Sequence, residues 1–142
     1  MGVSPVNGHL EIPGDWTTIG VDAYRGCAEL VSVNMPSSVL KVSRGAFCGC
    51  GNLREINISK ALVSVGGKCC DGVCGAFAGC GFESISLPDT LKAIGYGAFR
   101  GNKNLKEVSF GTSPSLVSVD DRAFSDCTAL REISLPQGLS TL

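Results

Sequence analysis

The side chains with the most chemistry available to them are the cysteines, 8 in a chain of 142 residues. Four of them recur at one position of a repeated pattern, which Asn102 fills once: Cys27, Cys50, Cys80 and Cys127. A thiol can pack like a small apolar group while donating a weak hydrogen bond to the backbone. Since an asparagine amide can make the same bond, we predict that these four cysteines are buried structural thiols.

The other four cysteines lie outside that position: Cys48, Cys69, Cys70 and Cys74. Three of them fall in the short stretch from Lys68 to Cys74. Unpaired thiols, a disulfide from Cys48 to this stretch and a disulfide within the stretch are all compatible with the spacing. Four thiolates can also bind zinc, but the chain lacks the C-x-x-C pairs typical of zinc sites. We therefore name these four as candidate disulfide cysteines and expect no metal ion or other cofactor.

The sequence does not bring together the groups that would support catalysis. The one histidine, His9, lies near the N-terminus and away from the serines and cysteines of the repeats. The segment 66–68 (Gly-Gly-Lys) lacks the remainder of a phosphate-binding loop. Asp120, Asp121 and Asp126 do not have the spacing of a calcium loop, and we expect them to cap a short helix. We predict that the protein is not an enzyme.

Composition narrows the classes of partner and compartment. The 12 basic and 13 acidic residues leave a net charge of −1, and a chain with this charge does not attract nucleic acid strongly. Hydrophobic residues make up 44% of the chain, yet no apolar run approaches the roughly 20 residues of a spanning helix. Residues 1–10 contain neither Lys nor Arg and no apolar stretch, unlike a secretory signal. We predict no nucleic-acid partner and no direct membrane insertion. The compartment stays open between an intracellular chain and, for a fragment, a secreted or cell-surface one.

An internal repeat determines which elements position these residues. An alanine followed by Phe or Tyr occurs five times, with steps of 23, 30, 22 and 25 residues: Ala23, Ala46, Ala76, Ala98 and Ala123. The whole unit reads L-x-x-I-x-I-P-x-x-V-x-x-I-G-x-x-A-F-x-G-C. The longest step contains a Cys-rich insertion at 66–75. Self-similarity at a period in the twenties is typical of solenoid proteins.

Each unit predicts one strand, two corners and one aromatic side chain in the core. Alternation of apolar and polar residues predicts half-buried strands at Leu53–Ile58, Phe82–Leu87, Leu105–Phe110 and Leu130–Leu135. The following Pro ends the strand, a Gly permits a sharp corner, and Ala-Phe is expected on a short helical turn. A single unit cannot bury its apolar side, so we predict a stack of about five and a half coils. The stacked rings would be Tyr24, Phe47, Phe77, Phe99 and Phe124.

The outward residues of these strands would form two polar rows across the sheet. One row is Asn34, Asn57, Ser86, Ser109 and Ser134, and the other is Ser32, Glu55, Ser84, Glu107 and Glu132. Arg54, Lys106 and Arg131 flank them, with Glu83 at the same repeat position. A solvated face on which each cation offsets a neighbouring Glu is one interpretation. The other is a partner-binding surface made by Arg54, Glu55, Asn57, Lys106, Glu107, Arg131 and Glu132.

The unit resembles the BspA-like, or treponemal-type, leucine-rich repeat. The resemblance covers Ile12 to Leu142 and is most specific at Ile94–Asn102 and Cys127–Pro136, where Ile-Gly, Ala-Phe, Cys and Leu-x-x-Ile-x-Leu-Pro occur. It implies a leucine-rich-repeat solenoid, a right-handed superhelix with a parallel β-sheet. It also implies protein or surface recognition rather than catalysis. Many relatives are exposed proteins of bacteria and single-celled eukaryotes, and some are adhesins.

We expect a single domain over 1–142, with a lead-in at 1–11 and repeats over 12–142. The sequence stops inside a repeat with no polar capping unit, so Leu139 and Leu142 join the candidate binding residues. A fragment of a longer protein, a partner that covers the end and end-to-end stacking of two copies would each account for this. We therefore predict a non-catalytic protein–protein interaction module that binds through the sheet face or the C-terminal end. The alternatives are a small structural subunit of a larger assembly and a fragment of a cell-surface adhesin.

Overall fold

The fold is a stack of flattened coils, each with one strand on either side. A computed structural model describes residues 3–66, 75–131, 133 and 135–136. One side carries β1 (His9–Glu11), β3 (Ser32–Asn34), β5 (Glu55–Asn57), β7 (Ser84–Leu87) and β9 (Glu107–Phe110). The other side carries β2 (Thr18–Ile19), β4 (Lys41–Val42), β6 (Ser64–Val65), β8 (Ala93–Ile94) and β10 (Ser118–Val119).

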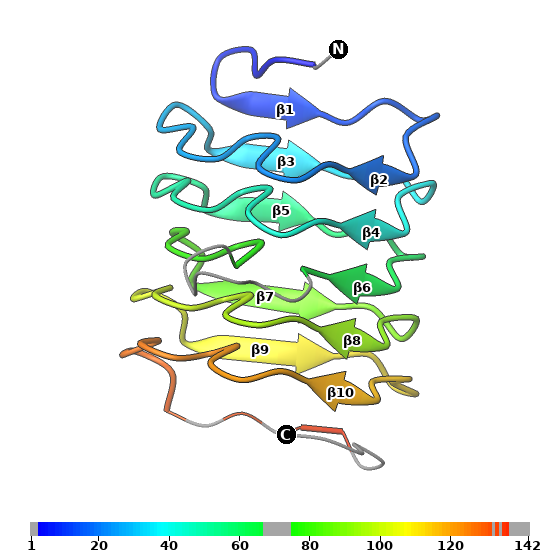
Figure 1. Ribbon diagram of the computed structural model, residues 1–142. Helices are drawn as coiled ribbons and strands as arrows, with labels where there is room; N and C mark the ends of the chain where they lie inside the picture. Colours follow the sequence, from blue (N-terminus) through cyan, green and yellow to red (C-terminus); the bar gives the residue numbers. More distant parts are fainter. Residues whose placement is uncertain (1–2, 67–74, 132, 134, 137–142) are drawn as a thin grey trace.

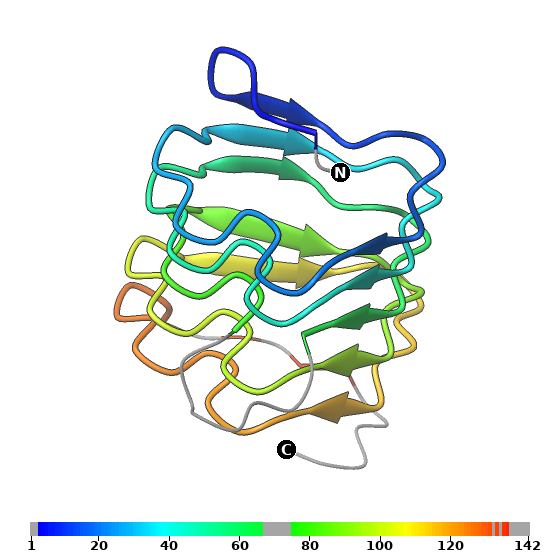
Figure 2. The same cartoon turned by 45° about the horizontal axis from the view of Figure 1, so that its top comes forward.

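The strands of each side run parallel, and the chain winds down the stack as a right-handed solenoid (Figures 1 and 2). From β1 to β9 it completes about four turns, which confirms the predicted solenoid. The expected five and a half coils included residues 137–142, which lie outside the described residues.

A second sheet lies where the sequence predicted only a short apolar pair. The two-residue strands β2, β4, β6, β8 and β10 form one continuous parallel sheet. In each of them the second residue is buried, as Val42 and Ile94 are. Strands this short are easily missed because two residues show no alternation over several positions.

The corner that holds Ala-Phe is a run of tight turns, and the described residues contain no helix. The expected short helical turn is therefore wrong for this corner. Gly45 and Gly49, on either side of the Ala-Phe pair, adopt positive φ angles of 71° and 79°, which a right-handed helix cannot contain. The backbone N–H of Phe47 donates to Ala76 O in the next coil at 2.8 Å rather than to its own turn. The corner therefore becomes a ladder between coils.

The core is a column of aromatic rings with aliphatic residues packed around it. Tyr24, Phe47, Phe77, Phe99 and Phe124 stack in order, with centroids 5.4–5.5 Å apart and interplanar angles of 3–12°. This confirms the predicted aromatic column. At its N-terminal end the Tyr24 hydroxyl donates to Val3 O at 2.7 Å, which ties residues before β1 to the stack.

The coils remain in register on both sides of the Cys-rich insertion. Residues 67–74 are not described, but Gly66 N donates to Val42 O at 2.6 Å just before them. Just after them, Gly49 N donates to Ala78 O at 2.8 Å. The hydrogen bonds between coils at Gly66 and Gly49 are therefore intact on the two sides of the insertion.

Candidate protein-binding face

The outward face of β3, β5, β7 and β9 carries the first four residues of each predicted polar row, whereas Glu132 and Ser134 lie outside the described residues. Ser32 is in register with Glu55, and Asn34 with Asn57. On the next pair of strands, Ser84 is in register with Glu107 and Ser86 with Ser109. Parallel pairing without a shift places equivalent side chains about 4.8 Å apart along each row.

Strand β1 extends both rows by one residue each, which the sequence analysis missed. His9 lies opposite Ser32, and Glu11 lies opposite Asn34. The signal was present, because Leu10-x-Ile12-Pro13 matches the I-x-I-P part of the unit. The residues assigned to the lead-in therefore contain the first strand of the sheet.

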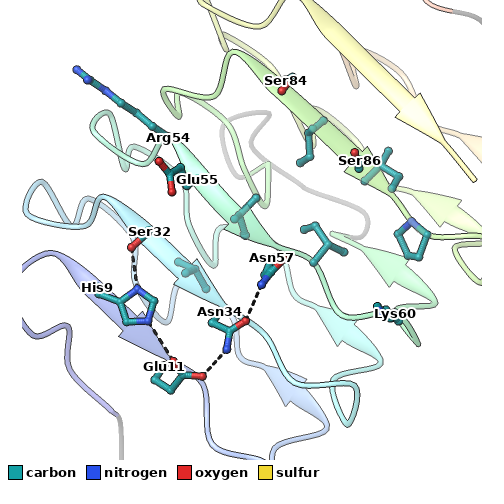
Figure 3. Close-up of a pocket in the computed structure, with 16 residues that line it drawn as sticks. His9, Glu11, Ser32, Asn34, Arg54, Glu55, Asn57, Lys60, Ser84 and Ser86 are labelled. Carbon is teal, nitrogen blue, oxygen red and sulfur yellow. Dashed lines mark hydrogen bonds and ion pairs between the residues drawn. The ribbon is translucent and has the colours of Figure 1, made fainter.

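A chain of hydrogen bonds joins these polar side chains across three strands (Figure 3). His9 Nδ1 lies 2.7 Å from Ser32 Oγ, and His9 Nε2 lies 3.1 Å from Glu11 Oε1. The Asn34 amide donates to Glu11 Oε2 at 2.5 Å, and the Asn57 amide donates to Asn34 Oδ1 at 3.0 Å. Because both asparagines donate in the same direction, the row ends on the Glu11 carboxylate. The hydrogen bond from His9 and then that from Asn34 lower the pKa of Glu11 below its usual 4.5.

Beyond β5 the face carries separate polar pairs. Lys106 Nζ lies 3.6 Å from Glu83 Oε1, and the Ser86 and Ser109 hydroxyls are 3.0 Å apart. Both charged side chains of the pair are exposed, and such pairs contribute little stability. This pair matches the interpretation in which cations offset neighbouring Glu side chains.

A groove of about 880 Å³ crosses the face from β1 to β7. Arg54, Glu55 and Asn57 line it, together with Lys60. Of the other predicted binding residues, Lys106, Glu107 and Arg131 lie outside the lining. Glu132, Leu139 and Leu142 lie outside the described residues. The groove thus brings together the three predicted residues of β5 and its flank, and these lie beside the missed His9 and Glu11.

The groove opens toward the core between β5 and β7. Ile56 and Ile58 are half-buried, whereas residues at the same repeat positions of the β3 and β7 coils are buried: Val33, Met35, Ile85 and Leu87. The outward sheet is interrupted at this place, since β1-β3-β5 and β7-β9 form separate ladders. Two core isoleucines are therefore accessible at the centre of a polar face.

A shortened connection accounts for the interruption. Leu53 comes three positions after Cys50, but Phe82 comes only two positions after Cys80. In coils of normal length, the residue just before the outward strand donates to the preceding coil: Arg54 N to Val31 O at 2.9 Å, and Lys106 N to Glu83 O at 2.8 Å.

In the shortened coil, by contrast, the carbonyl oxygen of Leu53 accepts from Gly81 N at 2.9 Å. A side chain at Gly81 would clash, because a Cβ atom there would lie 2.6 Å from Gly51 O. The strand β7 therefore starts at a position displaced from the one that would pair it with β5.

The repeated cysteines have the structural role that the sequence predicted for three of them. The thiols donate to carbonyl oxygens of the preceding coil: Cys50 to Tyr24 at 3.1 Å, Cys80 to Phe47 at 3.2 Å and Cys127 to Phe99 at 3.1 Å. Asn102 is buried and donates to Phe77 O at 2.7 Å, so it replaces a cysteine in the same bond. The prediction of a buried thiol is wrong for Cys27, which is half-buried. It belongs to the first of these coils, where the sequence has no earlier Ala-Phe corner to supply an acceptor.

Burial raises the pKa of the three buried thiols, Cys50, Cys80 and Cys127. It raises the pKa of Cys50 to about 11 from 9.0, and it raises those of Cys80 and Cys127 as well. Cys48, one of the candidate disulfide cysteines, is half-buried, while Cys69, Cys70 and Cys74 lie outside the described residues. The disulfide interpretation stays a prediction.

The described ranges hold no cluster of three or more His, Cys, Asp or Glu side chains that could bind a metal ion. The expectation that Asp120, Asp121 and Asp126 cap a helix is wrong, because the corner that holds them consists of turns. The Asp126 carboxylate lies 3.5 Å from Arg100 Nε. No helix in the same ranges is long and apolar enough to cross a bilayer.

Parallel coils with a ladder of aromatic rings and a polar sheet face define a leucine-rich-repeat solenoid. The sequence matches the BspA type leucine-rich repeat region in 6 copies, over residues 7–72 and 74–142. The chain belongs to this family. No curated protein matches it.

Solved structures share the fold. A leucine-rich cell surface protein of Faecalibacterium prausnitzii is 30% identical with a TM-score of 0.75, over 92% of this chain and 33% of that one. A leucine-rich repeat protein of Bacteroides ovatus is 28% identical with a TM-score of 0.59, over 92% and 40%. The pneumococcal vaccine antigen PcpA is 20% identical with a TM-score of 0.69, over 92% and 40%, and shares the fold. The chain thus spans 33–40% of the length of these proteins.

Proposed function

We propose that this chain is a non-catalytic module that binds a protein partner through the outward face of β1, β3, β5, β7 and β9. The observation that carries the proposal is the groove, in which the polar row from Glu11 to Asn57 borders the half-buried Ile56 and Ile58. An apolar centre inside a polar rim is the usual composition of a protein-binding patch. Solenoids commonly bind partners through such extended surfaces.

The predicted binding residues divide into two groups in this proposal. Arg54, Glu55 and Asn57 contact the partner in the groove, since they line it. Lys106 and Glu107 extend the contact along β9, and Arg131 extends it further. The single domain over 1–142 and the lack of catalysis are part of the same proposal, and family membership supports both.

We also propose that the module acts at a cell surface. The support is the similarity to the Faecalibacterium cell surface protein, which is 30% identical over 92% of this chain. An exposed location would make the groove accessible to proteins outside the cell. It would also favour the disulfide interpretation of Cys48, Cys69, Cys70 and Cys74, because disulfides persist in oxidising compartments.

Site-specific photo-crosslinking in cells of the source organism tests the proposal. A photoreactive amino acid replaces Ser84, which lines the groove, or Lys41, which lies on the opposite side in β4. We expect one adduct of defined mass from position 84 and none from position 41. Arg54→Glu should lower the yield of that adduct at least fivefold. The proposal would be contradicted if position 84 gave no adduct or if both positions gave equal adducts. An adduct yield that Arg54→Glu leaves unchanged would also contradict it.

A further inference from the structure

The facing edges of β5 and β7 have no paired strand among the described residues, whereas the other neighbouring strands are paired. The other sheet is continuous from β2 to β10, including the β6–β8 pair directly behind this opening. Between β5 and β7 no backbone hydrogen bond is present in the described ranges, and the bond from Gly81 to Leu53 precedes both strands. Free strand edges are templates for pairing with another extended chain.

The opening is apolar on its inner side and polar on its outer side. Ile56, Ile58, Ile85 and Leu87 all line the groove from the inner side of the sheet. Glu55 and Ser84 stand on the outer side, in the polar rows. A chain lying here would need aliphatic and polar side chains in alternation, which is the side-chain pattern of a strand.

Cations stand at the two ends of β5. Arg54 and Lys60 are exposed and line opposite ends of the groove beside this strand (Figure 3). Neither has an ion-pair partner in the described part of the chain, whereas Glu83 already pairs with Lys106. Acidic residues at both ends of an occupant would complement these charges, and a neutral residue suits the position beside Glu55.

We propose that an extended peptide segment of a partner protein inserts between β5 and β7 as an additional strand. Its backbone would pair with both free edges and make the outward sheet continuous, the mode known as strand addition. Aliphatic side chains would cover Ile56 and Ile58, and acidic residues would contact Arg54 and Lys60. The segment spans seven residues, the number of positions from residue 54 to residue 60. This inference rests on the proposed protein-binding function and specifies its partner.

A synthetic peptide with these features is the direct probe. Acetyl-Asp-Thr-Val-Thr-Val-Ser-Asp carries a fluorophore, and its pattern is nearly the same in both directions, so it favours neither strand orientation. We expect saturable binding by fluorescence anisotropy to the full chain. Amide hydrogens of residues 55–58 and 84–87 should exchange at least tenfold more slowly at saturation. Failure to saturate at millimolar protein, or protection confined to other strands, would overturn the inference.

Two matched control peptides distinguish strand addition from nonspecific binding. N-methylation of the central Thr removes one backbone donor with little other change, and we expect at least tenfold weaker binding. Replacement of both Val residues by Ser should weaken binding to a similar extent. Equal affinity of the N-methylated peptide would overturn the inference, because a strand must pair through its backbone.

Protein variants test the charges and the opening. Arg54→Glu with Lys60→Glu should weaken the acidic peptide at least tenfold and restore binding when the peptide's Asp residues become Lys. Lys41→Glu in β4, an exposed position on the opposite side of the solenoid, should leave the affinity unchanged. Inserting one Asn between Gly81 and Phe82 restores the normal spacing and should abolish binding if the variant keeps the native circular dichroism spectrum. Unchanged affinity in the double-charge variant would overturn the inference even if the insertion variant does not fold.

The peptide and crosslinking experiments fail in distinguishable ways. A partner adduct at position 84 that the peptide does not displace would refute strand insertion and leave the protein-binding face standing. The absence of any adduct at position 84 would instead refute the proposed function, whatever the peptide does.

Discussion

The thiol of Cys80 lies 3.2 Å from the carbonyl oxygen of Phe47, a residue 33 positions earlier in the chain. Cys50 has the same relationship to Tyr24, at 3.1 Å. Each bond satisfies a backbone acceptor beside the aromatic column, where burial excludes water. The cysteines therefore act as small buried donors that join successive coils.

Stability should decrease in alkaline solution because of these thiols. Burial raises the pKa of Cys50 to about 11, so between about pH 9 and pH 11 the unfolded chain loses a proton that the folded chain keeps. The unfolded state then binds fewer protons, and the free energy of unfolding falls as the pH rises. Urea unfolding in reducing buffer at several pH values measures this slope.

The control is Cys50→Ser, which keeps a small donor that does not titrate in this range. We expect a shallower decrease of stability with pH in this variant, since one of the buried titrating thiols is absent. An identical slope in both proteins would show that Cys50 does not contribute to the pH dependence.

Asn102 should be important for stability even though it interrupts the cysteine pattern. Its amide donates to Phe77 O at 2.7 Å and to Phe99 O at 2.8 Å, inside the core. Asn102→Ala removes both donors and should lower the free energy of unfolding by about 1–3 kcal/mol. Urea unfolding measures the loss.

Asn102→Cys is the matched variant, because a thiol makes the equivalent bond in three other coils. It also removes Asn102 Oδ1, a buried acceptor without a hydrogen-bond partner. We therefore expect its loss of stability to be at least about 1 kcal/mol smaller than that of Asn102→Ala. A cysteine variant as unstable as the alanine variant would refute the equivalence of the two side chains.

Backbone strain in the last described corner should be relieved by glycine. Arg122 has a φ of 60°, and Gly97 has the same φ at the equivalent position one coil earlier. Left-handed geometry costs a residue with a Cβ atom about 1–2 kcal/mol. Arg122→Gly should therefore raise the free energy of unfolding by about 1 kcal/mol.

Gly97→Ala is the reciprocal experiment and should lower stability by a similar amount. A Cβ atom at Gly97 meets nothing closer than Arg100 Cβ at 3.8 Å, so the cost comes from the backbone angle. Thermal unfolding of the two single variants and of the double variant compares the effects. Changes of the same sign in both single variants would contradict the explanation.

The sequence predicted the elements that the repeat determines directly. The aromatic column and the outward polar rows follow from side chains that recur at fixed positions, so counting residues was sufficient to place them. The buried thiols were predictable for the same reason, since Asn102 occupies a cysteine position and can make the same bond. His9 and Glu11 were missed because the first copy of the repeat is incomplete, although Leu10 and Ile12 mark its register.

The groove could not be predicted from the repeat, because it arises from a departure from it. The connection from Cys80 to Phe82 is one residue shorter than its counterparts, and alignment by residue type hides this difference. Its effect depends on whether β7 can still pair with β5, which is a property of three-dimensional packing. The Ala-Phe corner was also misassigned, because the positive φ angles of its glycines are not visible in the sequence pattern.

The interruption between β5 and β7 also affects how the protein unfolds. In a solenoid, cooperativity passes only between neighbouring coils, so the weakest contact between coils limits it. Here one of the two strand ladders is missing, and the two parts are connected by the β6–β8 ladder, the hydrogen bonds of the Ala-Phe corner and the stacked Phe47 and Phe77 rings. We therefore expect residues 3–66 and 75–131 to unfold as two foldons, and a peptide strand bound between them to couple their unfolding into a single transition.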